Sequence, residues 1–401
     1  MNFNFANTRA LVRVDFNVPI DKKTFQITDD TRMRAALPTI NKILNDGGSV
    51  ILLSHFDRPL KKLKEDGTVD VKRFTLQNLQ SHLADLLQRP VLFISDCLSE
   101  GAAQAAHNLK AGQVLLLENT RFYAGEEKGD VKMAEKLASY GDVFVNDAFG
   151  SAHRAHASTA TVAQFFPKDK RMFGYLMEAE VLNGQKVLNA PEKPFTAIIG
   201  GAKVSDKILI IKHLINRVDN LIIGGGMAYT FFKALGGQIG KSLCEEDRLE
   251  EARTIVAQAM KNGVRILLPF DSIVADAFKP DANTEILESD AINTEGMALD
   301  IGPKAAEIAR TILLESKTIL WNGPMGVFEM EAFANGTKKV AIAVVNATKN
   351  GAYSLVGGGD SVAALNALHL ENAVSYVSTG GGAMLEFLEG KTLPGIAAIE
   401  Q

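Results

Sequence analysis

Cysteine and long apolar runs are scarce in this chain of 401 residues. The two cysteines, Cys97 and Cys244, stand far apart and form no C-x-x-C pair. A disulfide framework is therefore excluded, and a reduced, cytoplasmic protein is predicted. No run of about 18 apolar residues is present, so no membrane-spanning helix is expected. Residues 1–10 lack a basic segment followed by an apolar run, so no signal peptide is predicted either.

An excess of positive charge is also lacking. Lysine and arginine number 43 and aspartate and glutamate 47, which gives a formal net charge of −4 at pH 7. That balance predicts neither nucleic acid nor an anionic membrane as a partner. Any site for an anionic ligand must then come from a local cluster of basic side chains.

Length and pattern predict two domains of the α/β class. A chain of this length exceeds the size at which one hydrophobic core keeps growing. Short apolar runs alternate with helical patterns, which is typical of parallel sheets with helices on both faces. The expected strands are 10–18, 49–54, 91–94, 113–117, 142–145, 195–199, 219–223, 264–268, 317–320, 353–356 and 373–377. The expected helices are 31–46, 75–88, 131–140, 203–217, 245–262, 303–315, 332–350 and 360–371. We expect two doubly wound, Rossmann-like domains joined by a helical connector at about 171–190.

The first expected strand has an unusual polar face. In VRVDFNVPI, residues 12–20, apolar and polar residues alternate as in a half-buried strand, and Pro19 would end it. The polar face would present Arg13, Asp15 and Asn17. A surface strand usually shows Lys, Glu or Thr at such positions, so solvent exposure alone does not explain these residues.

Basic residues follow the expected strands of the first half. Ligands of open parallel sheets bind beyond the carboxyl ends of the strands. The residues found there are Arg32, His55, Arg58, Arg121, His153, Arg154 and His156. Any one of these arginines, taken alone, is better explained as an ordinary residue of a surface loop. Together, on adjacent strands, they would form one basic basin whose planar guanidinium groups suit phosphate and carboxylate.

Glycines follow the expected strands of the second half. They occur in the segments 200–207, 224–232, 322–329, 357–361 and 378–383. Glycine at a strand-to-helix turn lets backbone N–H groups approach a phosphate. Lys203 and Lys207 are expected to lie one helical turn apart on a shared face. Asp360, at the start of a helix, could hold Mg²⁺ through oxygen.

Two common nucleotide motifs and a catalytic base are missing. The segment 236–242, GGQIGKS, would be a P-loop only with glycine at the position of Leu235. No G-x-G-x-x-G opens a helix with an acidic residue about twenty positions on, so no dehydrogenase is predicted. An acceptor that is already an anion, such as a carboxylate, needs no base. The sequence therefore predicts phosphoryl transfer between a nucleotide and a small polyanion, driven by alignment and charge stabilisation.

These motifs together resemble the phosphoglycerate kinase family along essentially the whole chain. The similar segments are R-x-D-x-N-V-P at 13–19, E-N-x-R-F at 118–122, N-D-A-F-G-x-A-H-R at 146–154, G-G-A-K-V-x-D-K at 200–207, I-I-G-G-G-M at 222–227, L-D-I-G-P at 299–303, W-N-G-P-x-G-V-F-E at 321–329, G-G-G-D-S at 357–361 and S-T-G-G-G-A at 378–383. The resemblance implies a reversible, Mg²⁺-dependent transfer of the acyl phosphate of 1,3-bisphosphoglycerate to ADP, which gives 3-phosphoglycerate and ATP.

The resemblance also implies a role for each site residue. The residues implied to bind 3-phosphoglycerate are Asp15, Asn17, Arg32, His55, Arg58, Arg121 and Arg154. Those implied to be catalytic are Arg32, Lys203, Gly381 and Gly382. Those implied to bind the nucleotide are Lys203, Lys207, Gly224, Gly225, Pro324, Glu329, Gly358, Gly359, Asp360 and Ser361, with Asp360 carrying Mg²⁺.

The family pattern further implies a domain layout and a mode of action. Residues 1–170 would bind 3-phosphoglycerate, 171–190 would form the connecting helix, and 191–380 would bind ADP or ATP. Residues 381–401 would pack back on the first domain. A monomer that closes around its substrates by hinge bending is implied.

Two departures from the family pattern leave alternatives open. Asp57 stands where the family has glycine in H-L-G-R-P, and Ala298 replaces a glycine near the expected nucleotide site. A carboxylate beside a phosphate-binding arginine should repel the ligand unless it points away or pairs with Lys61 or Lys62. The chain could therefore be a kinase for another small phosphorylated acid, or a catalytically weak homologue that binds anions or partner proteins. The presence of Arg32 and the other implied catalytic groups argues against the last alternative.

Overall fold

The computed structural model describes residues 1–401, which divide into two compact units. The first unit comprises Met1–Val181 together with Thr392–Gln401, and the second comprises Leu182–Lys391. Helix α7 (Tyr175–Asn189) carries the chain from one unit to the other. The predicted connector at 171–190 therefore begins as a short strand, β6 (Arg171–Phe173), and only then becomes helical. Whether the two units act as the predicted substrate domains stays a prediction.

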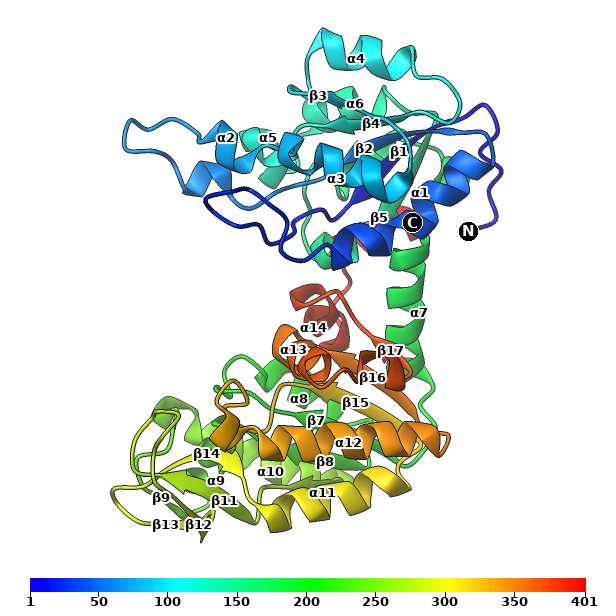
Figure 1. The fold of residues 1–401 in the computed structure, drawn as a ribbon. Helices are drawn as coiled ribbons and strands as arrows, with labels where there is room; N and C mark the ends of the chain where they lie inside the picture. The colour runs from blue at the N-terminus through cyan, green and yellow to red at the C-terminus, as the bar shows by residue number, and fades with distance from the viewer. The chain divides into compact units, whose positions relative to one another are not determined.

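The first unit is built on one parallel sheet of six strands in the order β3-β4-β2-β1-β5-β6 (Figure 1). Its remaining strands are β1 (Arg9–Val14), β2 (Ser49–Leu53), β3 (Val91–Ile94), β4 (Val114–Leu117) and β5 (Val143–Asp147). Its helices, besides α7, are α1 (Thr31–Asn45), α2 (Val71–Phe74), α3 (Gln77–Leu87), α4 (Glu100–His107), α5 (Ala124–Glu127), α6 (Val131–Ala138) and α15 (Pro394–Glu400).

Hydrophobic cores cover both faces of this sheet. Val12 and Leu52 pack with the apolar faces of α1 and α3 in one cluster. Leu11 and Phe144 pack with α4, α6 and Ile399 of α15 in the other. Parallel strands buried on both faces are nearly continuous apolar runs, and this is why their positions are easy to predict from sequence.

The prediction for the first strand is wrong in two respects. Strand β1 ends at Val14 instead of 18, and it lies in the middle of the sheet between β2 and β5. Because both faces of a central strand are covered, Arg13 is fully buried and does not sit on a solvent-facing side. Phe16 and Val18 are buried too, but in the irregular segment that follows the strand. The alternation of apolar and polar residues therefore indicates which side chains are buried, but it does not mark where the strand ends.

The second unit contains a second parallel sheet of six strands in the order β10-β8-β7-β15-β16-β17. These strands are β7 (Phe195–Ile199), β8 (Asn220–Ile223), β10 (Arg265–Leu267), β15 (Thr318–Asn322), β16 (Tyr353–Gly357) and β17 (Tyr376–Val377). Its helices are α8 (Ile208–Leu214), α9 (Met227–Ala234), α10 (Leu249–Asn262), α11 (Pro303–Glu315), α12 (Asn335–Lys349), α13 (Gly359–Ala367) and α14 (Gly382–Leu388). Trp321 of β15 is buried against α11 and α12, which lie side by side in Figure 1.

Two small sheets in this unit were not predicted. Strands β12 (Thr284–Glu288), β11 (Asp271–Ala275) and β14 (Met297–Ile301) form an antiparallel sheet, and β9 (Gln238–Ile239) pairs with β13 (Ala291–Ile292). Their strands are short, and β12 is mostly exposed, so no continuous apolar run marks them. The α/β class with parallel-sheet domains is confirmed, and these sheets are additions to it. None of the helices is both long and apolar enough to cross a membrane.

Candidate active site

The carboxyl ends of the parallel strands in the first unit bring the predicted anion-binding residues to one edge. Strand β1 pairs with β2 on one side and with β5 on the other, and β2 pairs with β4. The segments that leave β1, β2, β4 and β5 carry Asp15, His55, Arg121 and Arg154 respectively. Parallel pairing therefore gathers residues that are up to about 140 positions apart in the sequence.

Asp15, Asn17 and Arg32 form one group at this edge. Arg32, near the start of α1, donates to the backbone oxygen of Asn17 at 2.9 Å and lies 3.4 Å from a carboxylate oxygen of Asp15. The Arg32 side chain is 39% exposed, so the guanidinium keeps a free side. A hollow of about 410 Å³ is lined by Asn17, Val18, Pro19, Asp29 and Arg32. The group can therefore meet a small polar ligand.

His55 is buried at the base of a cluster of arginines. Arg13 donates to Nδ1 of His55 at 3.0 Å and to Ser158 Oγ at 2.8 Å. Burial, together with the charges of Arg13, Arg121, Arg154 and Arg32, holds the pKa of His55 well below its ordinary value. The imidazole is therefore neutral at physiological pH, and the positive charge of the cluster comes from arginine.

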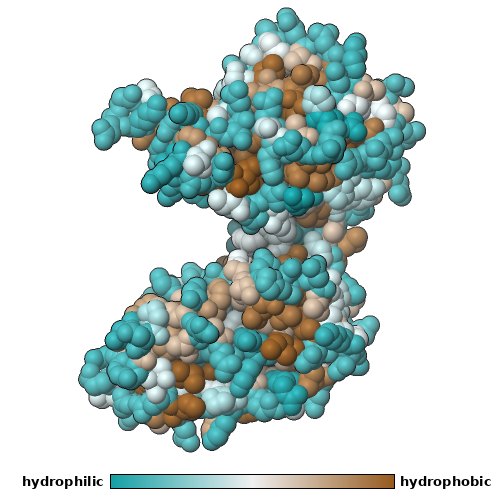
Figure 2. Space-filling model, in the orientation of Figure 1, coloured by the Kyte–Doolittle hydropathy of each residue, from teal (hydrophilic) through white to brown (hydrophobic).

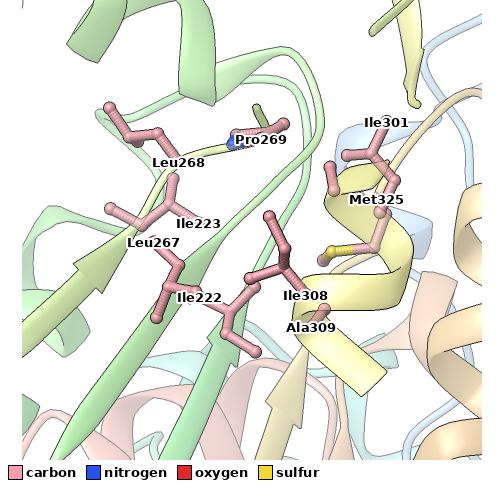
Figure 3. A pocket seen from close by; sticks show the side chains of 10 residues that line it. Ile222, Ile223, Leu267, Leu268, Pro269, Ile301, Ile308, Ala309 and Met325 are labelled. Carbon is pink, nitrogen blue, oxygen red and sulfur yellow. The ribbon is translucent and has the colours of Figure 1, made fainter. Parts of the chain in front are cut away.

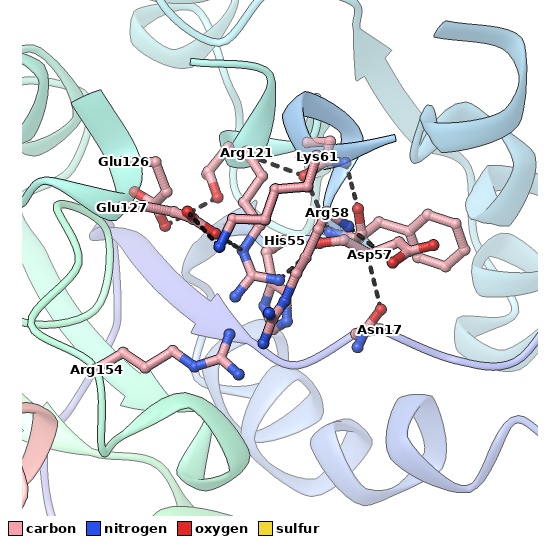
Figure 4. Close-up of polar contacts among 12 residues, drawn as sticks. Asn17, His55, Asp57, Arg58, Lys61, Arg121, Glu126, Glu127 and Arg154 are labelled. Atoms are coloured by element: carbon pink, nitrogen blue, oxygen red, sulfur yellow. Dashed lines mark hydrogen bonds and ion pairs between the residues drawn. The ribbon is translucent and has the colours of Figure 1, made fainter. Parts of the chain in front are cut away.

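Arg121, Arg154 and Arg58 converge on the same region (Figure 4). Burial, with Arg154 and Arg13 nearby, lowers the pKa of Arg121 to about 10, so it stays charged at neutral pH. Arg121 donates to the backbone oxygen of Asp57 at 2.6 Å. Arg58 is exposed, and the Arg154 side chain is half-buried. Guanidinium groups held this close repel one another unless an anion lies among them, which is the arrangement that a phosphate group satisfies.

Two buried residues that hold this cluster in place, Glu126 and Asn119, were not identified from the sequence. Buried Glu126 accepts from Ser158 Oγ at 2.6 Å, and Ser158 in turn accepts from Arg13, so a buried carboxylate balances the buried guanidinium. Asn119 fixes the loop after β2 through the backbone of Phe56, at 3.0 Å and 2.7 Å. The motif E-N-x-R-F contains Asn119, but the sequence carries no sign of what its amide contacts.

In the second unit, glycine turns at three neighbouring strand ends bind one another through the backbone. Gly201 donates to the oxygen of Pro324 at 3.1 Å, and Gly225 donates to that of Met325 at 3.0 Å. Gly225 has a φ of +69°, and a Cβ at this position would lie 2.5 Å from the oxygen of Gly201. Only glycine fits so close a backbone approach. The turns after β7, β8 and β15 therefore form a continuous backbone surface.

Lys207, Ser361 and Asp360 lie beside these turns. Lys207 donates to Oδ1 of Asn322 at the end of β15, and Ser361 accepts from the N–H of Gly323 at 2.5 Å. Burial lowers the pKa of Lys207, and Asp360 opposes that shift. Asp360 is exposed in the first turn of α13, after Gly358 with its φ of +91°.

The expected helical spacing of Lys203 and Lys207 is wrong. Helix α8 begins at Ile208, and residues 203–207 form turns before it. Both lysines therefore lie on the strand-to-helix connection, where Lys203 is exposed. The remaining predicted residues also lie outside helices or at their starts. Glu329 is exposed in the loop after β15, and Gly381 and Gly382 begin α14 with Gly381 at a φ of +51°.

An apolar cavity between β8, β10 and α11 is a different feature. Figure 3 shows it lined by Ile222, Leu267 and Ile308, among other apolar side chains. Its volume is about 20 Å³, which is room for little more than one water molecule. A nucleotide base does not fit in this space, so we do not assign the cavity to the nucleotide.

A metal ion would have few protein ligands in this chain. No group of three or more His, Cys, Asp or Glu side chains is placed to hold one. Mg²⁺ commonly binds to one or two carboxylates together with substrate phosphates and water. The single exposed carboxylate of Asp360, beside the glycine turn, fits an ion that arrives with a nucleotide.

Comparison with known proteins extends over the whole chain. The family model described as phosphoglycerate kinase matches residues 1–391. A phosphoglycerate kinase from Porphyromonas gingivalis is 54% identical over 421 residues, covering 99% of this chain and 99% of that protein. One from Herpetosiphon aurantiacus is 51% identical over 395 residues, covering 98% and 97%. The structure of phosphoglycerate kinase from Coxiella burnetii matches with a TM-score of 0.89 at 41% identity, over 99% of this chain and 97% of that one.

These matches, with the two parallel-sheet units, define a kinase whose phosphoryl acceptor is a carboxyl group. The chain belongs to the phosphoglycerate kinase family. The family reaction generates ATP in glycolysis by transfer of an acyl phosphate to ADP. The family resemblance and the enzyme class predicted from the sequence are thus confirmed.

Proposed function

We propose that the arginine cluster of the first unit binds the phosphate of 3-phosphoglycerate and that the glycine turns of the second unit bind ADP or ATP. The observation that carries this proposal is the set of guanidinium groups around buried, neutral His55. The guanidinium groups of Arg58, Arg121 and Arg154 converge on one region, where a bound phosphate would accept hydrogen bonds from them. Arg58, Arg121 and Arg154 would hold this phosphate through paired hydrogen bonds.

The group made by Asp15, Asn17 and Arg32 would bind the other end of the substrate. Asp15 and Asn17 would accept from and donate to its hydroxyl and carboxyl groups. The free side of the Arg32 guanidinium would face the carboxyl oxygen that receives the phosphoryl group. Its positive charge would stabilise the charge that develops during transfer.

The backbone N–H groups of the glycine turns would hold the nucleotide phosphates. Gly224, Gly225 and Pro324 would border the base, and Glu329 would accept from the ribose hydroxyls. Lys207, Gly358, Gly359 and Ser361 would surround the phosphates, with Asp360 as the ligand for Mg²⁺. Mg²⁺ bound with the nucleotide would neutralise phosphate charge. Lys203 would follow the moving phosphoryl group, because its exposed ammonium is free to reorient.

A carboxylate acceptor needs no general base, so alignment and electrostatics would supply the catalysis. The N–H groups of Gly381 and Gly382 would add donors to the transferring phosphoryl group. Transfer also requires the two substrates to meet with water excluded, which protects the acyl phosphate from hydrolysis. Hinge closure therefore stays a prediction that belongs to this mechanism.

The test is ATP formation from ADP and 1,3-bisphosphoglycerate with Mg²⁺, compared between the wild type and Lys203→Ala. We expect the kcat of the variant to fall by about a hundredfold or more, because a donor to the developing charge is lost. The exposed Lys64→Ala is the matched control and should retain full activity. An inactive wild type would overturn the proposed substrate, and an unimpaired Lys203→Ala would overturn the assignment of that residue.

We also propose that the enzyme acts as a monomer in the cytoplasm. Cys97 and Cys244 are both free thiols, which suits a reducing compartment. Light scattering on the purified chain should give a mass near 43.3 kDa. A mass twice as large would contradict the monomer.

A further inference from the structure

The loop after β2 carries an acidic residue within the predicted phosphate site. Asp57 lies between His55 and Arg58, and its φ is +51°. L-residues rarely adopt this left-handed conformation, although Asp and Asn tolerate it better than others because their side chains can bind the local backbone. Asp57 does so, since one of its carboxylate oxygens accepts from the N–H of Arg58 at 2.8 Å.

The backbone of Asp57 connects two of the predicted substrate-binding residues. Its N–H donates to Oδ1 of Asn17 at 2.8 Å, and its carbonyl oxygen accepts from Arg121 at 2.6 Å. Figure 4 shows Asp57 between these two side chains. The orientation of this one peptide segment therefore sets the positions of an amide and a guanidinium at the site.

Lys62 neutralises the carboxylate of Asp57. Its ammonium lies 2.7 Å from both carboxylate oxygens. The two residues are brought together by the 3-10 turn Pro59–Lys61, in which the N–H of Lys62 donates to the oxygen of Pro59 at 3.2 Å. The Lys62 side chain is 48% exposed and that of Asp57 is 32% exposed, so the pair sits at the rim of the site.

The same turn also places a lysine, Lys61, near a second acidic residue, Glu127. Lys61 lies 3.8 Å from Glu127, and Glu127 lies 3.7 Å from Nε of Arg121. Asp57 and Glu127 thus each have a lysine partner, from the end of this turn or from the residue directly after it. The residues that follow, at the tip of this loop, present a hydrophilic surface in Figure 2.

We propose that Asp57 and Lys62 act together as positioning residues for the phosphate of the acid substrate. The carboxylate of Asp57 fixes the loop that holds Asn17 and Arg121, and Lys62 cancels its charge so that it neither repels the phosphate nor competes for Arg58. This inference rests on the proposed function of the arginine cluster. Because the acid is already paired with Lys62, it is not expected to repel the substrate.

The charge argument makes Lys62→Met the informative variant. It keeps the length and apolar stem of the side chain but leaves Asp57 unpaired beside the cluster. We expect the KM for 3-phosphoglycerate to rise by about tenfold, because an unscreened carboxylate then faces the phosphate. The kcat and the KM for ATP should stay within about twofold of wild type, because neither reports on this loop. Lys64→Met removes an equal charge from the same loop without touching Asp57, so its KM should not change.

A second substitution in the Lys62→Met background separates charge from other effects. Asp57→Asn removes the unpaired charge and is compatible with the positive φ. The double variant should recover a KM within about twofold of wild type, as expected when the effect of Lys62→Met comes from the charge of Asp57 alone. Thermal unfolding midpoints of all variants establish that each is folded.

Two results would overturn the inference. An unchanged KM in Lys62→Met would show that the charge of Asp57 does not reach the substrate. Failure of Asp57→Asn to rescue that variant would show that Lys62 binds the phosphate itself. Neither result bears on the proposed function, which fails only if the wild type does not turn over 3-phosphoglycerate.

Discussion

At the residue scale, the first unit stabilises a positive charge that is fully buried. Arg13 is fully buried, and its guanidinium is balanced through Ser158 by Glu126, which is also fully buried. Without that carboxylate, burial of a guanidinium would cost several kcal/mol. The neutral state of His55 follows from the same crowding, because a further positive charge among the arginines would be unfavourable.

The effect of these neighbouring arginines on His156 should be measurable, because it makes the stability of the protein depend on pH. Burial, with the charges of Arg121, Arg13 and Arg154, lowers its pKa to about 3. The unfolded chain takes up a proton at His156 below its ordinary value of about 6.5, and the folded protein does not. Stability contributed by this group is therefore complete above pH 7 and is lost as pH falls.

The variant His156→Gln isolates this contribution. Between pH 7 and pH 5, the free energy of unfolding of the wild type should fall by about 2 kcal/mol relative to the variant. Urea unfolding of both proteins at pH 7 and pH 5 measures this change. The contributions of the other titrating groups cancel when the two proteins are compared. A difference between the two proteins that does not change with pH would contradict the lowered pKa.

At the scale of single elements, the unpredicted antiparallel sheet has a role in holding a helix. Asp271 of β11 is buried, and its carboxylate accepts from the N–H groups of Lys304 and Ala305 at 3.1 Å and 2.7 Å. These are the second and third residues of α11, whose first residue is Pro303. Asp271 thus caps α11 from a strand more than thirty residues earlier.

Asp271→Ala should therefore lower the free energy of unfolding by about 2 kcal/mol, since two backbone donors, one of them buried, lose their acceptor. Urea unfolding at pH 7 is the measurement. Asp281→Ala, at an exposed position in the same region, should change stability by less than about 0.5 kcal/mol. Equal losses in the two variants would exclude the capping role.

The elements predicted from sequence are those that a local pattern marks. Buried parallel strands such as β2 and β4 are continuous apolar runs, and α11 has the bounds expected for it, 303–315. The end of β1 was missed because Phe16 and Val18 keep the alternation after the strand has stopped. The antiparallel sheet was missed because its strands are short and are not marked by continuous apolar runs. They form by pairing with one another, and a local sequence pattern does not report that pairing.

In the candidate site, too, some features could be inferred from local sequence patterns and others could not. Motif residues such as Arg121 and Asp360 could be predicted because their spacing within the chain is local. The contacts of Arg13 with His55, and of Asp57 with Lys62, depend on side-chain directions that no periodicity reports. For Asp57, the sequence left three possibilities open: that it points away, that it pairs with Lys61, or that it pairs with Lys62.

At the scale of the whole molecule, each unit has its own hydrophobic core, and the last helix belongs to the first unit. The N–H of Gly395 donates to the oxygen of Ala152 at 2.8 Å, and Asn146 donates to the oxygen of Gly395 at 3.1 Å. Ile399 is 7% exposed within the core that covers one face of the first sheet. Helix α15 is therefore part of the packing of the first unit.

Ile399→Ala should destabilise the first unit by about 3 kcal/mol, because it leaves a cavity in that core. Hydrogen exchange should show faster exchange in β4 and β5, while β15 and β16 keep their protection. The half-exposed Ile342→Ala on α12 serves as the control and should leave β4 and β5 unchanged. Equal loss of protection in all four strands would mean that the two units unfold together.

The position of α15 also constrains the order in which the protein can be completed during translation. Strand β5 ends at Asp147, yet the core on its sheet is filled only when residues near 399 have been synthesised. The second unit, Leu182–Lys391, is encoded entirely before that point. In a nascent chain, the core of the first unit therefore stays incomplete until residues near 399 have left the ribosome, after the whole of the second unit has been synthesised.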